Sequence, residues 1–153
     1  MSKFKLSKRS LDEMKGIDDE LIEVAKQAIK ITKLDFGVTE GIRTLERQKE
    51  LKKSGASYTL KSKHITGNAF DVVGYIGGRV SWEISTYWEI AEAMKAAAIK
   101  KGVSIRWGGA WHIPDITKSL NSMEEEHFAY IALRVAQGRR PFIDGPHFET
   151  VKV

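Results

Sequence analysis

The 153-residue sequence contains no cysteine. This absence excludes disulfide bonds, thiolate zinc fingers, iron–sulfur clusters and a cysteine nucleophile, and it fits either a reducing or an oxidising compartment. A metal site in this chain therefore has to be built from histidine, aspartate or glutamate side chains.

Long apolar segments are missing as well. No uninterrupted run approaches the roughly 20 apolar residues that cross a bilayer, so we expect no stable membrane insertion. The basic N-terminal stretch MSKFKLSKRS is not followed by the apolar core of a secretory signal. We therefore expect the protein to be made and kept in a cytoplasm unless another event releases it.

Positive charge is in modest excess. The formal net charge is +5 and the isoelectric point is near 9.4, which favours anionic partners such as nucleic acid, a membrane surface or an anionic wall polymer. The lysines and arginines are spread along the chain, without the basic block and interleaved aromatics of a nucleic-acid-binding protein. We interpret them as a solvated basic surface and expect no nucleic-acid partner.

Helix signals mark residues 18–33, 82–100 and 122–137. In the first two segments apolar residues recur at helical spacing, and Gly102 ends the second. The third begins with the capping-box pattern Ser122-Met-Glu-Glu125 and is closed by Gly138 and then Pro141. Ser10-Leu-Asp-Glu13 has the same capping-box spacing.

Short strands are predicted between these helices. The segments DFGVTEGIR, AFDVVGY, VSIRW and HFETVKV are rich in β-branched and aromatic residues, and IGGR is typical of a hairpin turn. Between the first two strands, Thr44 can cap a helix that Gly55 ends. Because no regular βαβ repeat is present, we expect an α+β fold with a small antiparallel β-sheet flanked by helices. Without linkers or internal repeats, we expect a single domain over residues 1–153.

Four histidines are available as metal ligands, namely His64, His112, His127 and His147. A lone histidine is more often packed or solvated than bound to a metal. His64 differs because the stretch SKHITGNAFD places it seven residues before Asp71, across a turn that can bring both side chains to one point. Asp71 is also surrounded by apolar residues, and a buried carboxylate needs a partner such as a metal. The alternative is that Asp71 lies on the solvent face of a strand.

His147 lies in the stretch FIDGPHFET, three residues after Asp144. The intervening glycine and proline favour a sharp turn that can present both side chains to one cavity. Two histidines and one carboxylate would leave the fourth position of a tetrahedral zinc ion open to water. A second carboxylate beside that water could act as the general base. Spacing alone therefore suggests a hydrolytic zinc site.

Four segments of the sequence carry a family resemblance. The pattern S-x-H-x-x-G-x-A-x-D, from Ser62 to Asp71, resembles the signature of the LAS metallopeptidases. These include D-alanyl-D-alanine carboxypeptidases of the VanY type and phage L-alanyl-D-glutamate endopeptidases. The other three segments resemble the family's final motif, its substrate-binding arginine segment and its tryptophan loop. They are Asp144-Gly-Pro-His147-Phe-Glu149, Glu40-Gly-Ile-Arg43-Thr44 and Arg106-Trp-Gly-Gly-Ala-Trp111.

The resemblance implies a role for each matching residue. His64, Asp71 and His147 would ligate Zn²⁺, and Asp144 would activate the zinc-bound water and then protonate the leaving amine. Arg43 would bind a substrate carboxylate or stabilise the developing oxyanion. Ser62 would steady the His64 loop beside the substrate, and Trp111 would contact the substrate. The implied fold, of the Hedgehog/DD-peptidase type, agrees with the predicted α+β class.

Several alternatives stay open on the sequence. Arg43 could be a surface charge, and Trp107 and Trp111 could be core packing. About 32 residues separate the tryptophan loop from the final motif, which is longer than in short phage members of the family. That segment contains His112 and His127, either of which could replace His147 in a rival site.

The leading hypothesis is a peptidoglycan-degrading zinc endolysin of a bacteriophage, which hydrolyses the L-alanyl-D-glutamate bond of the stem peptide. Such a lysin would be a monomer made in the host cytoplasm, and it would reach the wall after the membrane is permeabilised. The alternatives are a D-alanyl-D-alanine carboxypeptidase of the same group and a non-catalytic basic module that binds the wall or nucleic acid. Structural zinc normally has four protein ligands, whereas the motif supplies three and a base, so catalysis is favoured.

Overall fold

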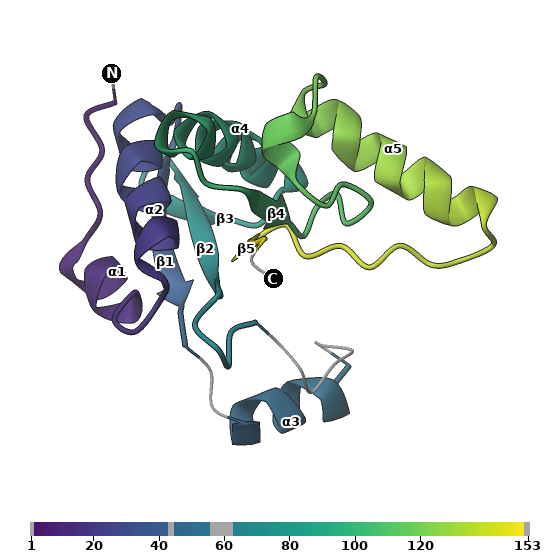
Figure 1. Ribbon diagram of the computed structural model, residues 1–153, viewed down its shortest axis with the longest axis horizontal. Helices are drawn as coiled ribbons and strands as arrows, with labels where there is room; N and C mark the ends of the chain where they lie inside the picture. The colour runs from purple at the N-terminus through teal and green to yellow at the C-terminus, as the bar shows by residue number, and fades with distance from the viewer. Residues whose placement is uncertain (1, 43–44, 56–62, 152–153) are drawn as a thin grey trace.

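The computed structural model describes residues 2–42, 45–55 and 63–151 (Figure 1). The helices and strands follow one another in the order α1 (Lys8–Glu13), α2 (Asp19–Ile31), β1 (Asp35–Glu40), α3 (Leu45–Lys53), β2 (Ala69–Ile76), β3 (Arg79–Ser81), α4 (Ile84–Lys101), β4 (Ile105–Trp107), the 3₁₀ helix η1 (Ile116–Lys118), α5 (Met123–Ala136) and β5 (His147–Thr150).

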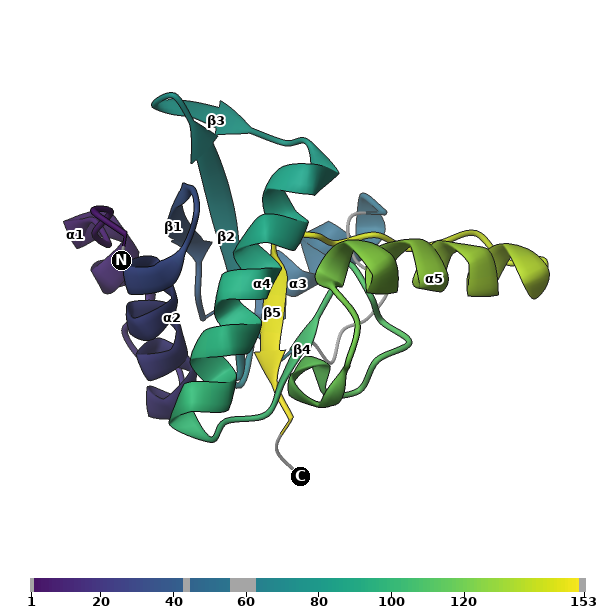
Figure 2. The same ribbon diagram turned by 90° about the horizontal axis from the view of Figure 1, so that it is seen from above.

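The strands form one antiparallel sheet. Its order is β1-β2-β5-β4, and β3 pairs with β2 through a hairpin. Gly77 and Gly78 form the hairpin turn with φ of 58° and 78°, which only glycine adopts readily. Figures 1 and 2 show α2 and α4 packed along this sheet. The prediction of an α+β fold with a small antiparallel sheet flanked by helices is confirmed.

The two faces of the sheet differ in chemistry. Alternate strand residues point to opposite faces, and on one face they build the core against α2 and α4. Gly74 of β2 lies on this face, because a Cβ added to it would contact Thr86 and Ile90 of α4. The fully buried side chains on it are Phe36, Val38, Phe70, Val72, Trp107 and Phe148. The residues between them, including Asp71, Arg106, His147 and Glu149, belong to the other face.

The long helices form where periodicity predicts them. Asp18 caps α2 by accepting a hydrogen bond from the Glu20 N–H at 2.9 Å, and the apolar stripe of α2 is buried. Gly102 ends α4 in the left-handed conformation with φ of 69°. The predicted capping box of α5 is present, with Ser122 and Glu125 each accepting from the other's backbone N–H at 3.1 Å.

The capping box predicted at Ser10 and Glu13 is wrong. The short helix α1 is capped by Ser7, and Ser10 lies inside it. The Ser10 hydroxyl is buried and accepts a hydrogen bond from the Val38 N–H of β1 at 3.0 Å. Ser10 therefore ties α1 to the sheet, because a tertiary contact takes the hydroxyl that local spacing assigns to a cap. The predicted cap Thr44 lies outside the described residues.

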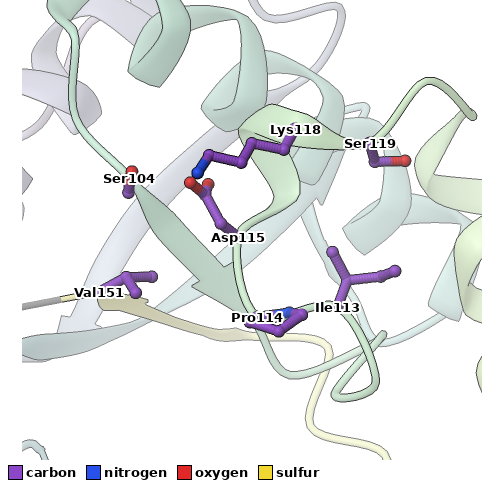
Figure 3. Close-up of a pocket in the computed structure, with 7 residues that line it drawn as sticks. All are labelled: Ser104, Ile113, Pro114, Asp115, Lys118, Ser119 and Val151. Carbon is purple, nitrogen blue, oxygen red and sulfur yellow. The ribbon is translucent and has the colours of Figure 1, made fainter.

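The segment between β4 and β5 forms η1 and α5. A pocket of about 620 Å³ beside η1 is lined by Ser104, Ile113, Pro114, Asp115, Lys118, Ser119 and Val151 (Figure 3). Its Asp115 and Lys118 side chains point toward each other, and none of the predicted site residues that the structure describes lines it. Among the described helices, none is both long and apolar enough to cross a membrane.

Candidate metal centre

Two neighbouring strands place Asp71 and His147 side by side. Asp71 of β2 is the register partner of His147, the first residue of β5. Directly opposite residues of an antiparallel pair have their side chains on the same face, a few ångströms apart. The Asp71 Oδ1 atom lies 3.4 Å from the His147 Nδ1 atom. The sheet register therefore brings two of the three predicted metal ligands together.

His64 reaches the same point from the loop before β2. Its Nδ1 lies 2.9 Å from the Gly41 carbonyl oxygen, and because a carbonyl only accepts, this nitrogen carries the proton. The opposite ring nitrogen, Nε2, lies 3.2 Å from Asp71 Oδ1 and 3.1 Å from His147 Nδ1. Gly41 thus orients the ring and leaves Nε2 for the site.

Glu149 and Lys63 orient His147 in the same way. The His147 Nε2 atom lies 2.8 Å from Glu149 Oε1, and Lys63 Nζ lies 3.1 Å from Glu149 Oε2. Lys63 also donates to the Thr150 carbonyl at 2.7 Å. Because Glu149 holds Nε2, His147 presents Nδ1 to His64 and Asp71.

These three side chains form a donor set that can hold a metal ion. Their ligand atoms all lie within 4.8 Å of one another. The far nitrogen of each histidine is held by an oxygen atom, which is the arrangement that surrounds most metal-bound histidines. Both imidazoles are buried, so the donors are also shielded from water. Two nitrogens and one carboxylate oxygen are ligand types that suit a transition-metal ion.

The charges of the site shift its pKa values strongly. Burial alone would raise the pKa of Asp71, but its close polar contacts with His147 and His64 outweigh burial and hold that pKa well below its usual value. Burial would lower the pKa of His147, yet hydrogen bonds to Asp71 and Glu149 and the charges of Asp71 and Asp144 raise it to about 9. The lowered pKa of Asp71 and the raised pKa of His147 both reflect the close approach of the two side chains, whose Oδ1 and Nδ1 atoms lie 3.4 Å apart.

Asp144 lies at the edge of this cluster. Its backbone N–H donates to the Gly108 carbonyl at 2.9 Å, and the His147 N–H donates to the Asp144 carbonyl at 3.0 Å. The Trp107 indole N–H donates to the Gly145 carbonyl at 2.7 Å. The negative charge of Asp144 is near enough to raise the pKa of His147. The turn from Asp144 to His147 is thus fastened to the end of β4.

The tryptophan loop places Trp111 beside the metal centre, and Arg106 holds Trp111 in position. The Trp111 ring lies 5.3 Å from the His147 ring, centroid to centroid, and stacks on Phe142. Arg106 lies over the Trp111 ring at 5.1 Å and donates to the Trp111 carbonyl. Trp107 is fully buried in the core. Core packing was the open alternative for both tryptophans. It holds for Trp107, whereas Trp111 borders the cluster.

The remaining predicted residues lie elsewhere. Arg43 and Ser62 are outside the described residues. His127 is buried, with its Nδ1 at 2.7 Å from the Gly109 carbonyl oxygen, and His112 Nε2 lies 3.6 Å from Glu126 Oε1. Within the described residues neither histidine joins the cluster, so the rival site has no support.

Sequence reasoning assigned no role to Glu149, Lys63 or the Gly41 carbonyl. A signal for Glu149 was present, because residues two apart on a strand share a face and His147 and Glu149 have this spacing. No local signal marks Lys63 or Gly41, since both depend on how distant segments meet.

Known proteins resemble this chain in sequence. The family model of the phage L-alanyl-D-glutamate peptidase matches residues 1–131. The L-alanyl-D-glutamate peptidase of Escherichia phage T5 is 33% identical over 113 residues, which cover 71% of this chain and 82% of that protein. The peptidase of the same name from Listeria phage A118 is 30% identical over 106 residues, which are 67% of this chain but only 37% of that longer protein.

A solved structure shares the fold. The crystal structure of the L-Ala D-Glu endopeptidase ChiX of Serratia marcescens superposes with a TM-score of 0.71 and 33% sequence identity. The superposition covers 95% of this chain and 90% of ChiX. Because the family model matches most of the chain, and the T5 relative is matched over most of its length, the chain belongs to the phage L-alanyl-D-glutamate peptidase family.

Proposed function

We propose that this protein is a zinc-dependent endolysin that hydrolyses the L-alanyl-D-glutamate bond in the stem peptide of bacterial peptidoglycan. The observation that carries the proposal is the convergence of His64 Nε2, Asp71 Oδ1 and His147 Nδ1 within 4.8 Å, next to the turn that carries Asp144. The names of the phage relatives and of ChiX support the choice of scissile bond.

Each site residue has a defined task in this proposal. His64, Asp71 and His147 hold the zinc ion, which when bound polarises the peptide carbonyl and acidifies water. Asp144 takes a proton from the attacking water. It then delivers that proton to the glutamate nitrogen as the carbon–nitrogen bond breaks. The products are a new alanine carboxylate and a free glutamate amine.

The residues around the metal position the substrate. Trp111 offers an aromatic surface beside His147, on which an extended peptide can lie. We assign to Arg43 the binding of a substrate carboxylate or the developing oxyanion, and to Ser62 the steadying of the His64 loop. Residues 1–153 act as one catalytic domain, and because one chain supplies all three ligands, a single copy is the catalytic unit.

The place of action follows from the substrate. The protein would be made in the host cytoplasm and would act on the wall after the membrane is permeabilised. Its net charge of +5 favours approach to anionic wall polymers.

The decisive experiment is digestion of purified peptidoglycan with and without a chelator, followed by mass spectrometry of the new termini. We expect new alanine C-termini paired with free glutamate amines, and loss of cleavage in the chelator that zinc restores. Release of terminal D-alanine alone would instead identify a carboxypeptidase. Cleavage that survives complete metal removal would refute the metal mechanism, and no cleavage with zinc present would point to a binding module.

A further inference from the structure

A pocket of about 620 Å³ lies where β4 begins and β5 ends (Figure 3). Pockets that hold small ligands have volumes of about 300–1,000 Å³, so this one is large enough for a ligand. Its lining combines three apolar residues, two charged residues and two serines, namely Ile113, Pro114, Val151, Asp115, Lys118, Ser104 and Ser119. None of these residues has a task in the metal centre. The pocket is therefore a candidate for a second binding site.

The pocket is built on rigid parts of the fold. Ile116, in the middle of its helical wall η1, is fully buried in the core. Lys95 of α4 donates to the Ser119 carbonyl at 2.7 Å and so holds the end of this wall. On the strand side, the Val151 N–H donates to the Ser104 carbonyl at 3.1 Å, so β4 and β5 stay paired up to the pocket. A wall that is already ordered costs little conformational entropy when a ligand binds.

Asp115 and Lys118 give the pocket one charge of each sign. Their side chains point toward each other in Figure 3, yet within the described part of the chain neither takes part in an ion pair. Asp115 Oδ1 accepts hydrogen bonds from the Thr117 N–H at 3.0 Å and from the Thr117 hydroxyl at 2.6 Å. Burial would raise the pKa of this carboxyl, but hydrogen bonds from Thr117 and Ser104 and the charge of Lys118 lower it. Asp115 is therefore an ionised and fixed carboxylate opposite the Lys118 side chain.

A ligand that matches this lining carries an ammonium and a carboxylate close together. The ammonium would pair with Asp115 and the carboxylate with Lys118, and such charge-assisted hydrogen bonds are stronger than neutral ones. The two serine hydroxyls can donate or accept, and the three apolar residues would pack against a short methylene chain. A simple anion or a simple cation would pair with only one of the two charges. The chemistry therefore describes an amino-acid centre at the end of an alkyl chain, which is the side chain of diaminopimelate.

The strand residues of the pocket belong to the face of the sheet that carries the metal centre. Residues two apart on a strand share a face, and Val151 lies two residues after Glu149. Ser104 likewise lies two residues before Arg106, the register partner of Glu149. Four residues separate His147 from Val151, which is about 14 Å along a strand.

The stem peptide of peptidoglycan spans a comparable distance. Its D-glutamate is joined through the side chain to a diamino acid, which is lysine or diaminopimelate. From the nitrogen of the scissile bond to the end of a diaminopimelate side chain there are about ten covalent bonds of about 1.5 Å each. A peptide bound at the metal centre and extended along β5 can therefore bring this side chain to the pocket.

We propose that the pocket binds the diaminopimelate residue of the stem peptide while the metal centre holds the L-alanyl-D-glutamate bond. Asp115 pairs with the side-chain ammonium, and Lys118 pairs with the carboxylate beside it. The inference rests on the proposed function, because it places a second part of the same substrate. Lysine has the ammonium but no side-chain carboxylate. The enzyme is therefore expected to prefer walls with diaminopimelate at the third position of the stem peptide over walls with lysine there.

Two dipeptides test the pocket without any reaction. γ-D-glutamyl-meso-diaminopimelate and γ-D-glutamyl-L-lysine contain no L-alanyl-D-glutamate bond, so both can be titrated into the zinc-loaded wild-type protein. We expect the first to bind about tenfold more tightly, with NMR shifts at the amides of Ile113, Thr117 and Val151. Equal binding of the two, or shifts confined to the metal centre, would overturn the proposal. Free diaminopimelate that binds as tightly as its dipeptide would take the stem peptide out of the pocket and leave a site for free amino acids.

Lys118→Gln removes the charge that pairs with the carboxylate. We expect this variant to bind both dipeptides equally, whereas the control Lys100→Gln, at an exposed lysine of α4, keeps the tenfold preference. Asp115→Asn should weaken both dipeptides, because both carry the ammonium, and thermal unfolding checks that this variant is folded. A preference that survives in Lys118→Gln would contradict the assignment.

Cleavage of the matching tripeptides, which carry an N-terminal L-alanine, separates this inference from the proposed function. We expect Lys118→Gln to raise KM for the diaminopimelate peptide about tenfold and to leave kcat unchanged. If wild type and Lys118→Gln cleave both peptides with the same KM, the pocket has no part in recognition while the peptidase activity stands. If neither peptide nor wall is cleaved in the presence of zinc, the proposed function fails, and the dipeptide titration still decides on the pocket.

Discussion

A histidine has two ring nitrogens, and the two histidines of this site turn different ones toward the cluster. His64 presents Nε2 because the Gly41 carbonyl holds its Nδ1, whereas His147 presents Nδ1 because Glu149 holds its Nε2. Glu149 is in turn fixed by Lys63. Its pKa would be raised by burial, but hydrogen bonding and charge from His147, with help from Lys63, hold it below its usual value, so Glu149 stays an ionised acceptor. These neighbours decide which atoms can meet a metal.

Glu149→Gln tests this orienting role. Glutamine is nearly isosteric but uncharged, so it holds the His147 ring less firmly and makes Nδ1 a poorer donor. We expect zinc affinity to fall about 10–100-fold, measured by competition with a chromogenic chelator. The control Glu89→Gln alters a partly exposed glutamate of α4 that lies 3.8 Å from Lys33, and it should leave affinity unchanged. Unaltered zinc binding in the Glu149 variant would show that Glu149 does not orient the ligand.

Asp144→Asn tests the base. Asparagine keeps the shape of the side chain but cannot accept the proton, so we expect turnover on peptidoglycan to fall about 10²–10⁴-fold while bound zinc is retained. Metal content per chain is measured in the same preparation, and Glu89→Gln serves again as the control. Loss of the metal together with activity would make Asp144 a ligand and not the base.

Among the elements of the fold, the end of β4 governs the shape of the site. Gly108 donates to the His147 carbonyl at 2.9 Å and accepts from the Asp144 N–H at the same distance. Trp107 adds its bond to Gly145. The turn that carries Asp144 is therefore held by two consecutive residues, Trp107 at the end of β4 and Gly108 in the following loop, which join the tryptophan loop to the final motif.

Gly108→Ala tests this clamp. The added Cβ would lie 2.2 Å from the Asp144 carbonyl oxygen, which forces the turn to move. A displacement of about 1 Å at a reacting group can lower the rate about 100-fold, so we expect a loss of that order in turnover. Gly78→Asn is the control, because its surroundings are open and asparagine tolerates a positive φ. Full activity in the Gly108 variant would show that the turn does not depend on this close contact.

Across the whole molecule, the two faces of the sheet have different roles: one forms the core and the other carries the candidate metal centre. One face is buried under α2 and α4, and the other face carries ionisable groups that come together only in the folded state. Such groups link protonation to folding. His147 is the strongest case, because its pKa in the metal-free fold, about 9, lies above its ordinary value of 6.5.

This linkage predicts opposite pH trends with and without metal. The raised pKa of His147 stabilises the metal-free fold fully below pH 6.5, and this stabilisation is lost as the pH rises to about 9. Zinc needs the unprotonated ring, so the stabilisation by zinc grows over the same interval. We expect the difference in Tm between zinc-loaded and chelator-treated protein to widen from pH 6.5 to 9. A constant difference, measured by calorimetry, would contradict the assigned protonation of His147.

Much of the fold could be predicted because helices and turns are encoded locally. The apolar spacing of α2, the capping box of α5 and the glycines of the β2–β3 turn each act within a few residues, and each is present as expected. Ser10 was misjudged because its hydroxyl bonds Val38, 28 residues away. Local patterns carry no information about such a partner.

The sequence alone determined the residue types of the site, the absence of thiolate ligands and the strands that carry Asp71 and His147. Only the tertiary structure decided that His64 and His147, 83 residues apart, meet at 3.1 Å, and that Glu149, Gly41 and Gly108 set their geometry. The physical reason is the distance along the chain over which each interaction acts. Backbone preferences and side-chain periodicity act over a turn or two, whereas a metal site depends on strand register and loop packing between segments that meet only when the core has formed.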